Sequence, residues 1–487
     1  MLNYTGHPFV DVGVATITAF AGKRRPEDLT EADLDSIAEY MRRNYVVDPL
    51  KSFLTVAFPN SGFTQPAYNK TPEKRLIYAD RVLGAYKSDA PRLDIPGVFT
   101  GRPASALPLD VKGKLAPGRT YRQHIPLLTG EGVINFFPYG DAGLPVSGEA
   151  LLALQAMPLG CAKTQGRLLA VHSDDPNITF RFAREFLRRN REAIQMVQAA
   201  GGKKLPEPKR RTATFFVETL IRLEEERQKT ERRGNPASVT AYHFTNSGQG
   251  VDLDIYRLPM EVLDFIRTAV SGSYRPIWDL LVSRGWEITK PKKRSRTGEA
   301  PTAPEPRYNV FYEDLLRLPD GYPGFVRTYF LRIPWRGGRK EDPRRTYSLR
   351  DDVNLISWKM VDLFLRKVVR MEKERIEQIR KLGDTLAEYV AGENDRHFFR
   401  TFMTASRYEY IRIALIKASN ALVKRGKPPL VTFDQFVTIF EEGEDLPYND
   451  WRLARDLVLI RMIEQLYNRG WLKQHADELE TTMEEET

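Results

Sequence analysis

Apolar residues recur at helical spacing along the last third of the chain. Two such series are Val361, Phe364, Leu365, Val368 and Met371, and Phe398, Phe399, Phe402, Tyr410 and Ile413. An apolar face repeated every three to four residues is typical of an amphipathic helix that packs on its neighbours. Glycines at positions 383, 392, 426 and 443 separate the apolar segments. From about residue 352 to 471 the pattern therefore predicts a bundle of four or five helices.

The pattern before this bundle is mixed. Thr30, with Asp33 in the first turn, predicts a capped helix to about Arg43, and Thr71-Pro72 predicts another to about residue 86. The short apolar run 52–58 predicts a buried strand, whereas residues 11–21 fit a strand or a helix. Further elements are predicted as helices at 147–156, 177–199 and 212–229, strands at 240–244 and 252–256, and a helix from residue 259.

Long loops interrupt these elements. Residues 91–145 are punctuated by Pro and Gly, 290–306 read KPKKRSRTGEAPTAPEP, and 335–350 read WRGGRKEDPRRTYSLR. Segments with this composition and no apolar period predict loops or linkers. The fold class predicted from the whole pattern is α+β. It consists of a mixed α/β N-terminal region with long loops at 1–345, followed by an all-α C-terminal helical bundle at 346–487.

The charge balance points to a polyanionic partner. The 487 residues carry a formal net charge of +10 at pH 7, although the last ones include Asp477, Glu478, Glu480, Glu484, Glu485 and Glu486. A basic body favours nucleic acid or an anionic membrane. No transmembrane run, secretory signal or lipidation motif is visible, so we expect a cytoplasmic protein with no membrane partner. A basic protein without any polyanionic partner is the alternative.

Motifs for catalysis and for cofactors are missing from the sequence. There is no phosphate-binding glycine loop with its lysine, no dinucleotide fingerprint, and no pair of histidines four residues apart on a helix. The single cysteine, Cys161, excludes disulfide scaffolds and cysteine-based metal centres. Asp252 and Asp254 leave one enzymatic alternative, a metal-dependent nuclease, because phosphoryl transfer uses paired carboxylates. We otherwise expect a protein without catalytic residues, metal or cofactor.

Basic residues gather in sets that suit a phosphate backbone, where each contact releases condensed counterions. Two sets are Lys203, Lys204, Lys209, Arg210 and Arg211, and Lys290, Lys292, Lys293, Arg294 and Arg296. A third is Arg336, Arg339, Lys340, Arg344 and Arg345, and a fourth is Arg396, Arg400 and Arg407, which we predict to share one helical face. Solvated surface charge is the alternative for each set.

Two polar turns suit contact with a DNA duplex. The segments PNSGFTQ at 59–65 and FTNSGQG at 244–250 present Asn, Ser and Gln around a glycine. Amide side chains can read base edges, and glycine allows the backbone to approach a minor groove. Ordinary turns that Asn side chains stabilise have the same composition and are the alternative.

Longer motifs resemble a known family. They read YTGHPFVDVGVATI, FPNSGFTQPAY, RQHIPLLTGEGVINFFPYGDAGLPVSGEALLALQAMPLG and YHFTNSGQGVDLDIYRLP, and they span most of residues 1–260. Together they resemble the large subunit of the type I-B CRISPR Cascade complex, and the nearest branch is the Tneap-type family. That family commonly carries two Cys-x-x-Cys pairs in a zinc-ribbon-like loop, here about 91–150. The matching positions are Gly97, Thr100, Ser147 and Ala150, so the resemblance implies a loop without zinc.

The resemblance implies a non-catalytic subunit of an RNA-guided antiviral complex. Its partners would be CRISPR RNA, double-stranded target DNA with its displaced strand, the backbone, handle-capping and small subunits, and a helicase-nuclease recruited in trans. It would recognise the protospacer-adjacent motif and assist R-loop formation. The residues that we expect near this duplex are Asn60, Ser61, Gln65, Asn246 and Gln249, with Phe63 as a possible wedge. Small subunits could arise by internal translation from Met360, slightly preferred, or Met371. A general basic nucleic-acid-binding scaffold remains the non-enzymatic alternative.

Overall fold

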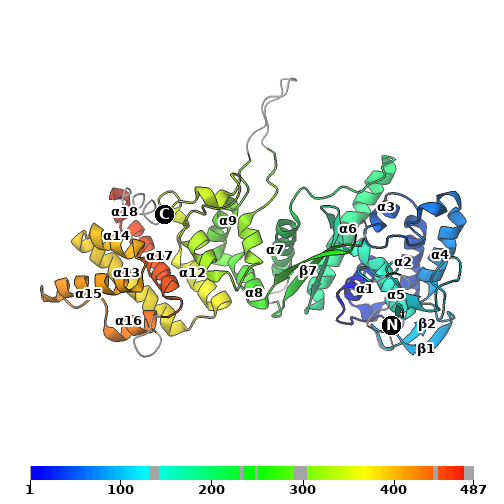
Figure 1. The fold of residues 1–487 in the computed structure, drawn as a ribbon, viewed down its shortest axis with the longest axis horizontal. Coiled ribbons are helices and arrows are strands. Elements are labelled where there is room, and N and C mark those ends of the chain that lie inside the picture. Colours follow the sequence, from blue (N-terminus) through cyan, green and yellow to red (C-terminus); the bar gives the residue numbers. More distant parts are fainter. Residues whose placement is uncertain are drawn as a thin grey trace, which may run out of the picture. The chain divides into compact units, whose positions relative to one another are not determined.

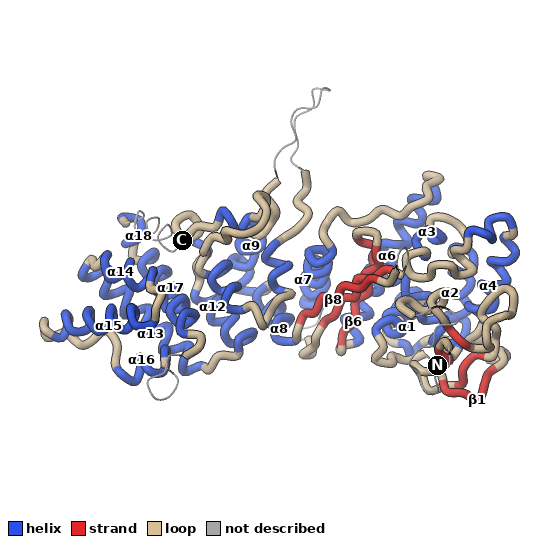
Figure 2. The backbone as a smooth tube through the Cα atoms, viewed as in Figure 1, coloured by secondary structure: helices blue, strands red, loops and turns tan. Residues whose placement is uncertain are grey.

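The computed structural model describes residues 2–128, 130, 142–230, 234–246, 250–289, 304–441 and 448–475. The chain forms two compact units, Met1–Met260 and Glu261–Thr487, which we call the first and the second unit (Figure 1). All named strands lie in the first unit, and residues from about 310 to 475 are helical wherever the described chain is regular (Figure 2). The predicted fold class, mixed α/β followed by all-α, is confirmed.

Helices of the first unit surround a small sheet. The helices are α1 (Pro8–Phe20), α2 (Glu31–Asn44), α3 (Leu50–Leu54), α4 (Pro72–Gly84), α5 (Gly148–Ala156), α6 (Pro176–Ala199) and α7 (Thr212–Thr230). The antiparallel sheet has the order β5 (Ala162–Thr164), β6 (Arg167–Ser173), β7 (Val239–Thr245) and β8 (Asp252–Leu258). Two further hairpins pair β1 (Arg92–Pro96) with β2 (Pro103–Ser105), and β3 (Arg119–Thr120) with β4 (Leu144–Pro145).

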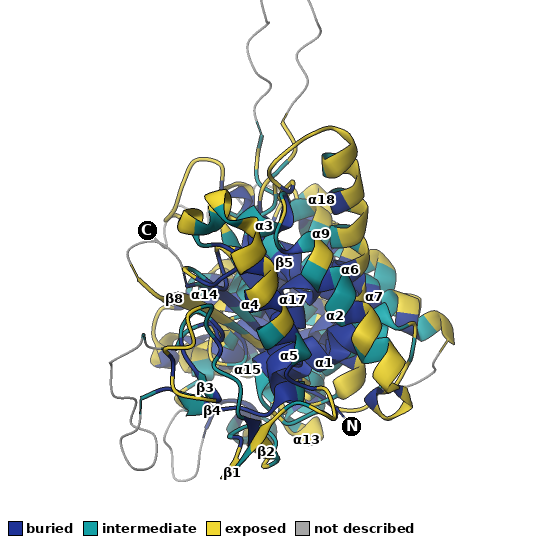
Figure 3. Cartoon of the chain, turned by 90° about the vertical axis from the view of Figure 1, so that its right-hand side faces the viewer, coloured by how far each residue is buried: buried dark blue, intermediate teal, exposed yellow. Residues whose placement is uncertain are grey.

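The core of the first unit forms around α1. Every residue from Phe9 to Thr18 is buried, and α1 contacts α5, α6 and β6 (Figure 3). The ring of Phe9 lies 4.8 Å from that of Phe244 on β7, which joins the helix to the sheet. A helix covered on all sides needs no polar face. This explains why residues 11–21 gave no helical period in the sequence.

The buried strand predicted at 52–58 is wrong. The chain forms α3 and then turns, in which the Phe58 amide donates to the Leu54 carbonyl at 2.8 Å. Val56, Ala57 and Phe58 are buried as the pattern indicated. No neighbouring strand pairs with them in the described chain, and their backbone groups are satisfied locally or by residue 246. A short apolar run specifies burial without specifying the backbone conformation.

The second unit is built from helices. They are α8 (Met260–Ala269), α9 (Arg275–Arg284), α10 (Val310–Leu315), α11 (Tyr322–Phe325), α12 (Trp358–Phe364), α13 (Lys373–Glu393), α14 (Arg396–Thr404), α15 (Tyr408–Val423), α16 (Phe433–Phe440), α17 (Trp451–Asn468) and α18 (Trp471–Gln474). None of the described helices is long and apolar enough to cross a membrane.

The unit boundary lies well before the one predicted at 345/346. Phe364 of α12 stacks on Phe325 with ring centroids 5.2 Å apart, and it meets Phe330 at 5.2 Å and Phe265 at 5.4 Å. These three partners all precede residue 346. The helices from α8 to α11 therefore share one core with the predicted bundle, which places them in the second unit.

Candidate nucleic-acid interface

In the first unit, Asn246 of the second polar turn lies against the residues that lead into the first, although about 190 residues separate them in the sequence. Asn246 joins them, because its backbone amide donates to the Val56 carbonyl at 2.8 Å and its Nδ2 donates to the Ala57 carbonyl at 3.0 Å. The same Nδ2 donates to the carbonyl of Arg122 at 3.1 Å, and the Arg122 guanidinium donates back to the Asn246 carbonyl. Three distant segments are thus fastened at one side chain.

This geometry gives Asn246 a different task from the one predicted for it. Its side chain is 0% exposed, and both of its donor contacts reach backbone carbonyls. Such a side chain holds segments together and does not face a base edge. The Oδ1 atom is buried and accepts no hydrogen bond within the described residues. The other predicted contact on this turn, Gln249, lies outside the described residues.

The turn at 59–65 presents two of its polar side chains outward. Asn60 is exposed and has a φ of 61°, a left-handed conformation that Asn tolerates better than most residues. Gln65 is half-buried, and its carbonyl accepts from Arg75 Nη2 at 3.3 Å. Ser61 is buried, with its Oγ 3.2 Å from that of Thr64. Of the predicted duplex contacts here, Asn60 and Gln65 can reach a ligand, whereas Ser61 supports the turn.

Phe63 belongs to the core. Its side chain is 0% exposed and makes edge-to-face contacts with Tyr45 and Tyr78, at centroid distances of 5.4 and 4.9 Å. From this position Phe63 cannot enter a base step without leaving the core, so the geometry does not support the predicted wedge. Gly62 serves the same packing, since a Cβ there would lie 2.1 Å from Cγ of Tyr78. Its role in this structure is close packing, where the sequence suggested an approach to DNA.

His124, two residues after Arg122, is buried and bonds to residues of other segments. His124 Nδ1 accepts from the Tyr121 amide at 3.2 Å, and Nε2 donates to the Leu109 carbonyl at 2.7 Å. Its own carbonyl accepts from Gln155 Nε2 at 2.8 Å. Burial lowers the pKa of His124 to about 4, which keeps the ring neutral with the proton on Nε2. Arg122 and His124 lie within a family-like stretch, but nothing local in the sequence indicates their distant partners.

Positions 97, 100, 147 and 150, which the sequence resemblance aligns with the cysteine pairs of the resembled family, lie close together. Thr100 Oγ1 lies 2.9 Å from Ser147 Oγ, across 47 residues of sequence. A Cβ on Gly97 would lie 2.7 Å from the Ser147 backbone nitrogen, and the Ala150 amide donates to Ser147 Oγ at 3.4 Å. Direct hydroxyl and backbone contacts close this loop where the resembled family carries thiols. The absence of zinc stays a prediction that elemental analysis would check.

The basic set between α6 and α7 lies on the surface. Lys203, Lys204 and Lys209 are exposed, and Arg210 lies 3.6 Å from Glu218. The loop is fastened to the sheet through Glu207, whose Oε2 accepts from the Gly166 amide at 2.8 Å. Arg211, the last predicted member, is half-buried. The basic set Lys290, Lys292, Lys293, Arg294 and Arg296 lies outside the described residues.

The third basic set divides into one half-buried arginine and four exposed cations. Arg344 binds Asp314 at 2.7 Å and Asp342 at 2.6 Å, and it lies over the Trp335 ring at 5.2 Å. With two carboxylates as partners, Arg344 holds its loop in place and is a poor candidate for a phosphate contact. The remaining members are exposed: Arg336, Arg339, Lys340 and Arg345.

The fourth basic set does not occupy one helical face as predicted. Arg396 and Arg400 are exposed and four residues apart on α14. That helix ends at Thr404, and Arg407 precedes α15 as its N-cap residue. The break at 405–407 separates Arg407 from the other two. An apolar period that continues across a sharp turn resembles one long helix in sequence, which explains the error.

Asp252 and Asp254 carry a basic partner between them. Arg167 on β6 reaches across β7, so that Nη2 binds Asp252 and Nη1 binds Asp254 Oδ2 at 2.9 Å. His243 Nδ1 lies 3.7 Å from the same Asp254 oxygen. A guanidinium therefore sits where a bridging metal would need to bind, which disfavours the nuclease alternative.

Chemistry elsewhere in the described part of the chain adds no rival site. No group of three or more His, Cys, Asp or Glu side chains within it could hold a metal ion. Cys161 is buried beside Met157, and burial raises the pKa of its thiol, so it is a poor nucleophile.

Comparison with protein-family models, with curated proteins and with solved structures finds no match for this chain.

Proposed function

We propose that this chain is the large subunit of an RNA-guided complex of the type I-B Cascade class. The observation that carries the proposal is that Asn246, in the family-like segment YHFTNSGQG, bonds to Arg122 in RQHIP and to Val56 and Ala57, which directly precede FPNSGFTQPAY. Surface turns without a joint role have no need to be fastened to one another by a buried side chain. With these segments held together, Asn60 and Gln65 on the turn 59–65 remain accessible to a ligand.

The loop at 91–150 gives independent support. Positions 97, 100, 147 and 150 meet, although the second pair follows the first by about 50 residues in the sequence. A zinc-ribbon-like loop that has exchanged its thiols for hydroxyl and backbone contacts would retain this arrangement. The spacing in the sequence and the closeness in space agree with the same origin.

In this proposed function, some residues recognise the protospacer-adjacent motif and others bind the nucleic-acid backbone. Asn60 and Gln65 contact the duplex that bears the protospacer-adjacent motif, while exposed cations such as Lys203, Lys204, Arg339 and Lys340 contact phosphates of the DNA or the CRISPR RNA. R-loop exchange is close to energetic balance, so a few such contacts suffice to favour it. Cleavage belongs to a helicase-nuclease recruited in trans, and this subunit needs no cofactor. The backbone, handle-capping and small subunits complete a cytoplasmic complex.

Purification of the tagged chain from cells that express its neighbouring genes tests this proposal. We expect discrete RNAs that share one 5′ handle, together with a fixed set of protein partners. Heterogeneous bound nucleic acid without fixed partners would instead indicate a general basic scaffold. Metal-dependent cleavage by the purified chain, abolished in Asp252→Asn, would revive the nuclease alternative.

Substitutions at the turn 59–65 distinguish motif recognition from sequence-independent binding. Asn60→Gly removes the amide while glycine keeps the positive φ without strain, and Gln65→Ala removes the second amide. The double variant should lose most of the affinity difference between correct and incorrect motifs, of the order of tenfold. The matched control, Lys203→Ala with Lys204→Ala, should weaken binding to all sequences and reduce its salt dependence. Unchanged motif discrimination in the turn variant would remove these residues from the interface.

A further inference from the structure

Helix α15 exposes an apolar face that no described element covers. Tyr410, Ile413, Ile416 and Val423 are between 46% and 53% exposed. The opposite face is buried through residues such as Ile411 and Leu415. Isolated exposed apolar residues are ordinary, but a row of them along one helix is typical of a binding surface.

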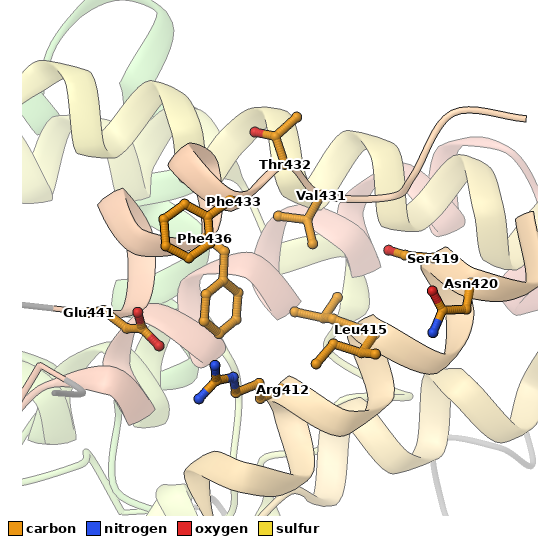
Figure 4. A pocket seen from close by; sticks show the side chains of 10 residues that line it. Arg412, Leu415, Ser419, Asn420, Val431, Thr432, Phe433, Phe436 and Glu441 are labelled. Carbon is orange, nitrogen blue, oxygen red and sulfur yellow. The ribbon is translucent and has the colours of Figure 1, made fainter. Parts of the chain in front are cut away.

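A groove lies on each side of this helix. The groove between α14 and α15, of about 470 Å³, is lined by Phe398, Thr401, Tyr410, Ile413 and Lys417 among others. The groove between α15 and α16, of about 220 Å³, is shown in Figure 4, with Arg412 and Leu415 facing Phe433 and Phe436. We call them the α14 groove and the α16 groove. Ile413 lines the first and Ile416 the second.

The charge along α15 and its flanking residues is one-sided, and the α14 groove is lined by Lys417 with one carboxylate, Asp395, which accepts from Tyr389. Residues 407–427 contain six basic side chains and one acidic side chain, Glu409. Two of the six, Arg425 and Lys427, pair with Glu393. The exposed row is mainly aliphatic, and aliphatic side chains do not stack on bases as aromatic rings do. An acidic peptide segment with apolar side chains complements this surface better than a nucleic-acid strand.

A segment with this chemistry follows α18 in the sequence. Residues 476–487, ADELETTMEEET, carry six acidic and no basic side chains, with Leu479 and Met483 four residues apart. We call this the acidic segment. In a helix, side chains four residues apart lie on one face.

The last described residue lies beside one end of the α14 groove. His475 stacks on Trp471 at 4.4 Å, and Trp471 Nε1 donates to Asn394 Oδ1 at 3.1 Å. Asn394 directly precedes Asp395, which lines the α14 groove. Twelve further residues span roughly 18 Å as a helix or about 40 Å extended, and a helix of the length of α15 spans about 24 Å. The acidic segment is therefore long enough to reach Ile413.

We propose that the acidic segment binds the α14 groove, with Leu479 and Met483 against Tyr410 and Ile413 and carboxylates near Lys417. The covalent link sets the local concentration of the segment at about the millimolar level, so weak contacts suffice. Bound there, it competes with polyanions for the cations of α14 and α15. This competition rests on the proposed function, whereas the intramolecular contact does not.

Cross-linking between paired cysteines tests the contact. Cys161 is the only native cysteine and is fully buried, so introduced pairs react alone in the folded chain. Met483→Cys with Ile413→Cys should form an intramolecular cross-link. Met483→Cys with Ile416→Cys is the matched control, because residue 416 is equally exposed but lines the α16 groove. We expect at least fivefold faster reaction for the first pair and a loss of this preference in 1 M salt, which screens the charges. Equal rates, or cross-links only between two chains, would overturn the proposal.

A second measurement tests whether the acidic segment competes with nucleic acid for this surface. Chain 1–475 should bind a labelled peptide of residues 474–487, and Ile413→Ala should weaken this binding whereas Ile416→Ala should not. The same truncated chain should bind single-stranded DNA severalfold more tightly than the full chain at low salt. Peptide binding that is indifferent to Ile413 would refute the site. Absence of DNA binding by both chains would contradict the proposed function and leave the cross-linking result to decide on the contact.

Discussion

Two asparagines of similar sequence context have opposite fates in this chain. Asn246 is buried, and its side-chain amide donates hydrogen bonds to two backbone carbonyls. Asn60 is exposed and has a positive φ. Both occur in an Asn-Ser-Gly triplet. A buried polar group contributes through its partners, since leaving any of them unpaired costs its full desolvation.

Removal of the Asn246 amide should therefore destabilise the first unit. Asn246→Ala leaves the carbonyls of Ala57 and Arg122 without this donor, and we expect a loss of about 1–3 kcal/mol in the free energy of unfolding. Asn60→Gly, the control in the neighbouring turn, should change it by less than about 0.5 kcal/mol. Urea unfolding followed by circular dichroism measures both values. Similar values for the two variants would contradict the role of Asn246 as a clamp.

Stability of the first unit should also fall in mild acid. Burial lowers the pKa of His124 to about 4, and it lowers the pKa values of His7 and His243 in the same direction. Below pH 6.5 the unfolded chain therefore binds protons that the folded chain excludes. For His124 the stabilising contribution is present above about pH 6.5 and is lost as the pH falls towards 4, by up to about 1.4 kcal/mol per pH unit, and His7 and His243 act in the same direction.

Unfolding midpoints measured between pH 7 and 4.5 test this dependence. In His124→Gln the profile should be flatter across that range, because one of the titrating groups is gone. A variant with the same slope as the original chain would show that His124 does not contribute.

At the scale of elements, α13 contains two glycines with different effects. One allows close helix packing, and the other affects only helix propensity. A Cβ at Gly383 of α13 would lie 2.7 Å from Cβ of Arg461 on α17, whereas nothing lies within 4 Å of a Cβ at Gly392. Gly383 therefore allows α13 and α17 to pack closely. Gly392 has no such role and only lowers helix propensity.

The two Gly→Ala substitutions should have opposite signs. Gly383→Ala should destabilise the second unit by about 1–3 kcal/mol through overpacking. Gly392→Ala should stabilise it by up to about 1 kcal/mol, because alanine is the better helix former. Thermal unfolding of the second unit gives the comparison. Destabilisation by both would mean that α13 tolerates no side chain at either position.

At the scale of the molecule, the boundary at 260/261 predicts which fragments fold. Fragments 1–260 and 261–487 each keep a complete core, so each should unfold cooperatively. Fragment 346–487 keeps Phe364 but loses Phe265, Phe325 and Phe330, and should aggregate or bind hydrophobic dyes. Circular dichroism and size-exclusion chromatography distinguish these outcomes. A well-folded fragment 346–487 would contradict the placement of α8–α11 in the same core.

The same reasoning bears on a small subunit made by internal translation. A product that begins at Met360 keeps Phe364 without those three aromatic partners. One that begins at Met371 omits Phe364 and retains α13–α18, in which α13 contacts both α16 and α17. We therefore expect Met371 to give the more soluble product, although the sequence pattern slightly favoured Met360.

Local signals in the sequence were sufficient for many elements. Thr30 caps α2 as predicted and forms a capping box with Asp33, and the helices at 147–156, 177–199 and 212–229 appear within a residue or so of the predicted limits. Caps, prolines at helix starts and apolar periods act over a few residues, so the sequence carries them directly. The helical character of the C-terminal region follows from the same kind of signal.

Only the tertiary structure decided what each polar group does. The sequence by itself determined the basic charge, the single cysteine, the helical periods and the presence of two Asn-Ser-Gly turns. It did not determine that Asn246 closes onto Ala57, that Phe63 enters the core, or that Arg167 and Arg344 each bind two carboxylates. These roles depend on partners up to about 190 residues away, and burial and pairing are properties of the folded chain that no local pattern encodes.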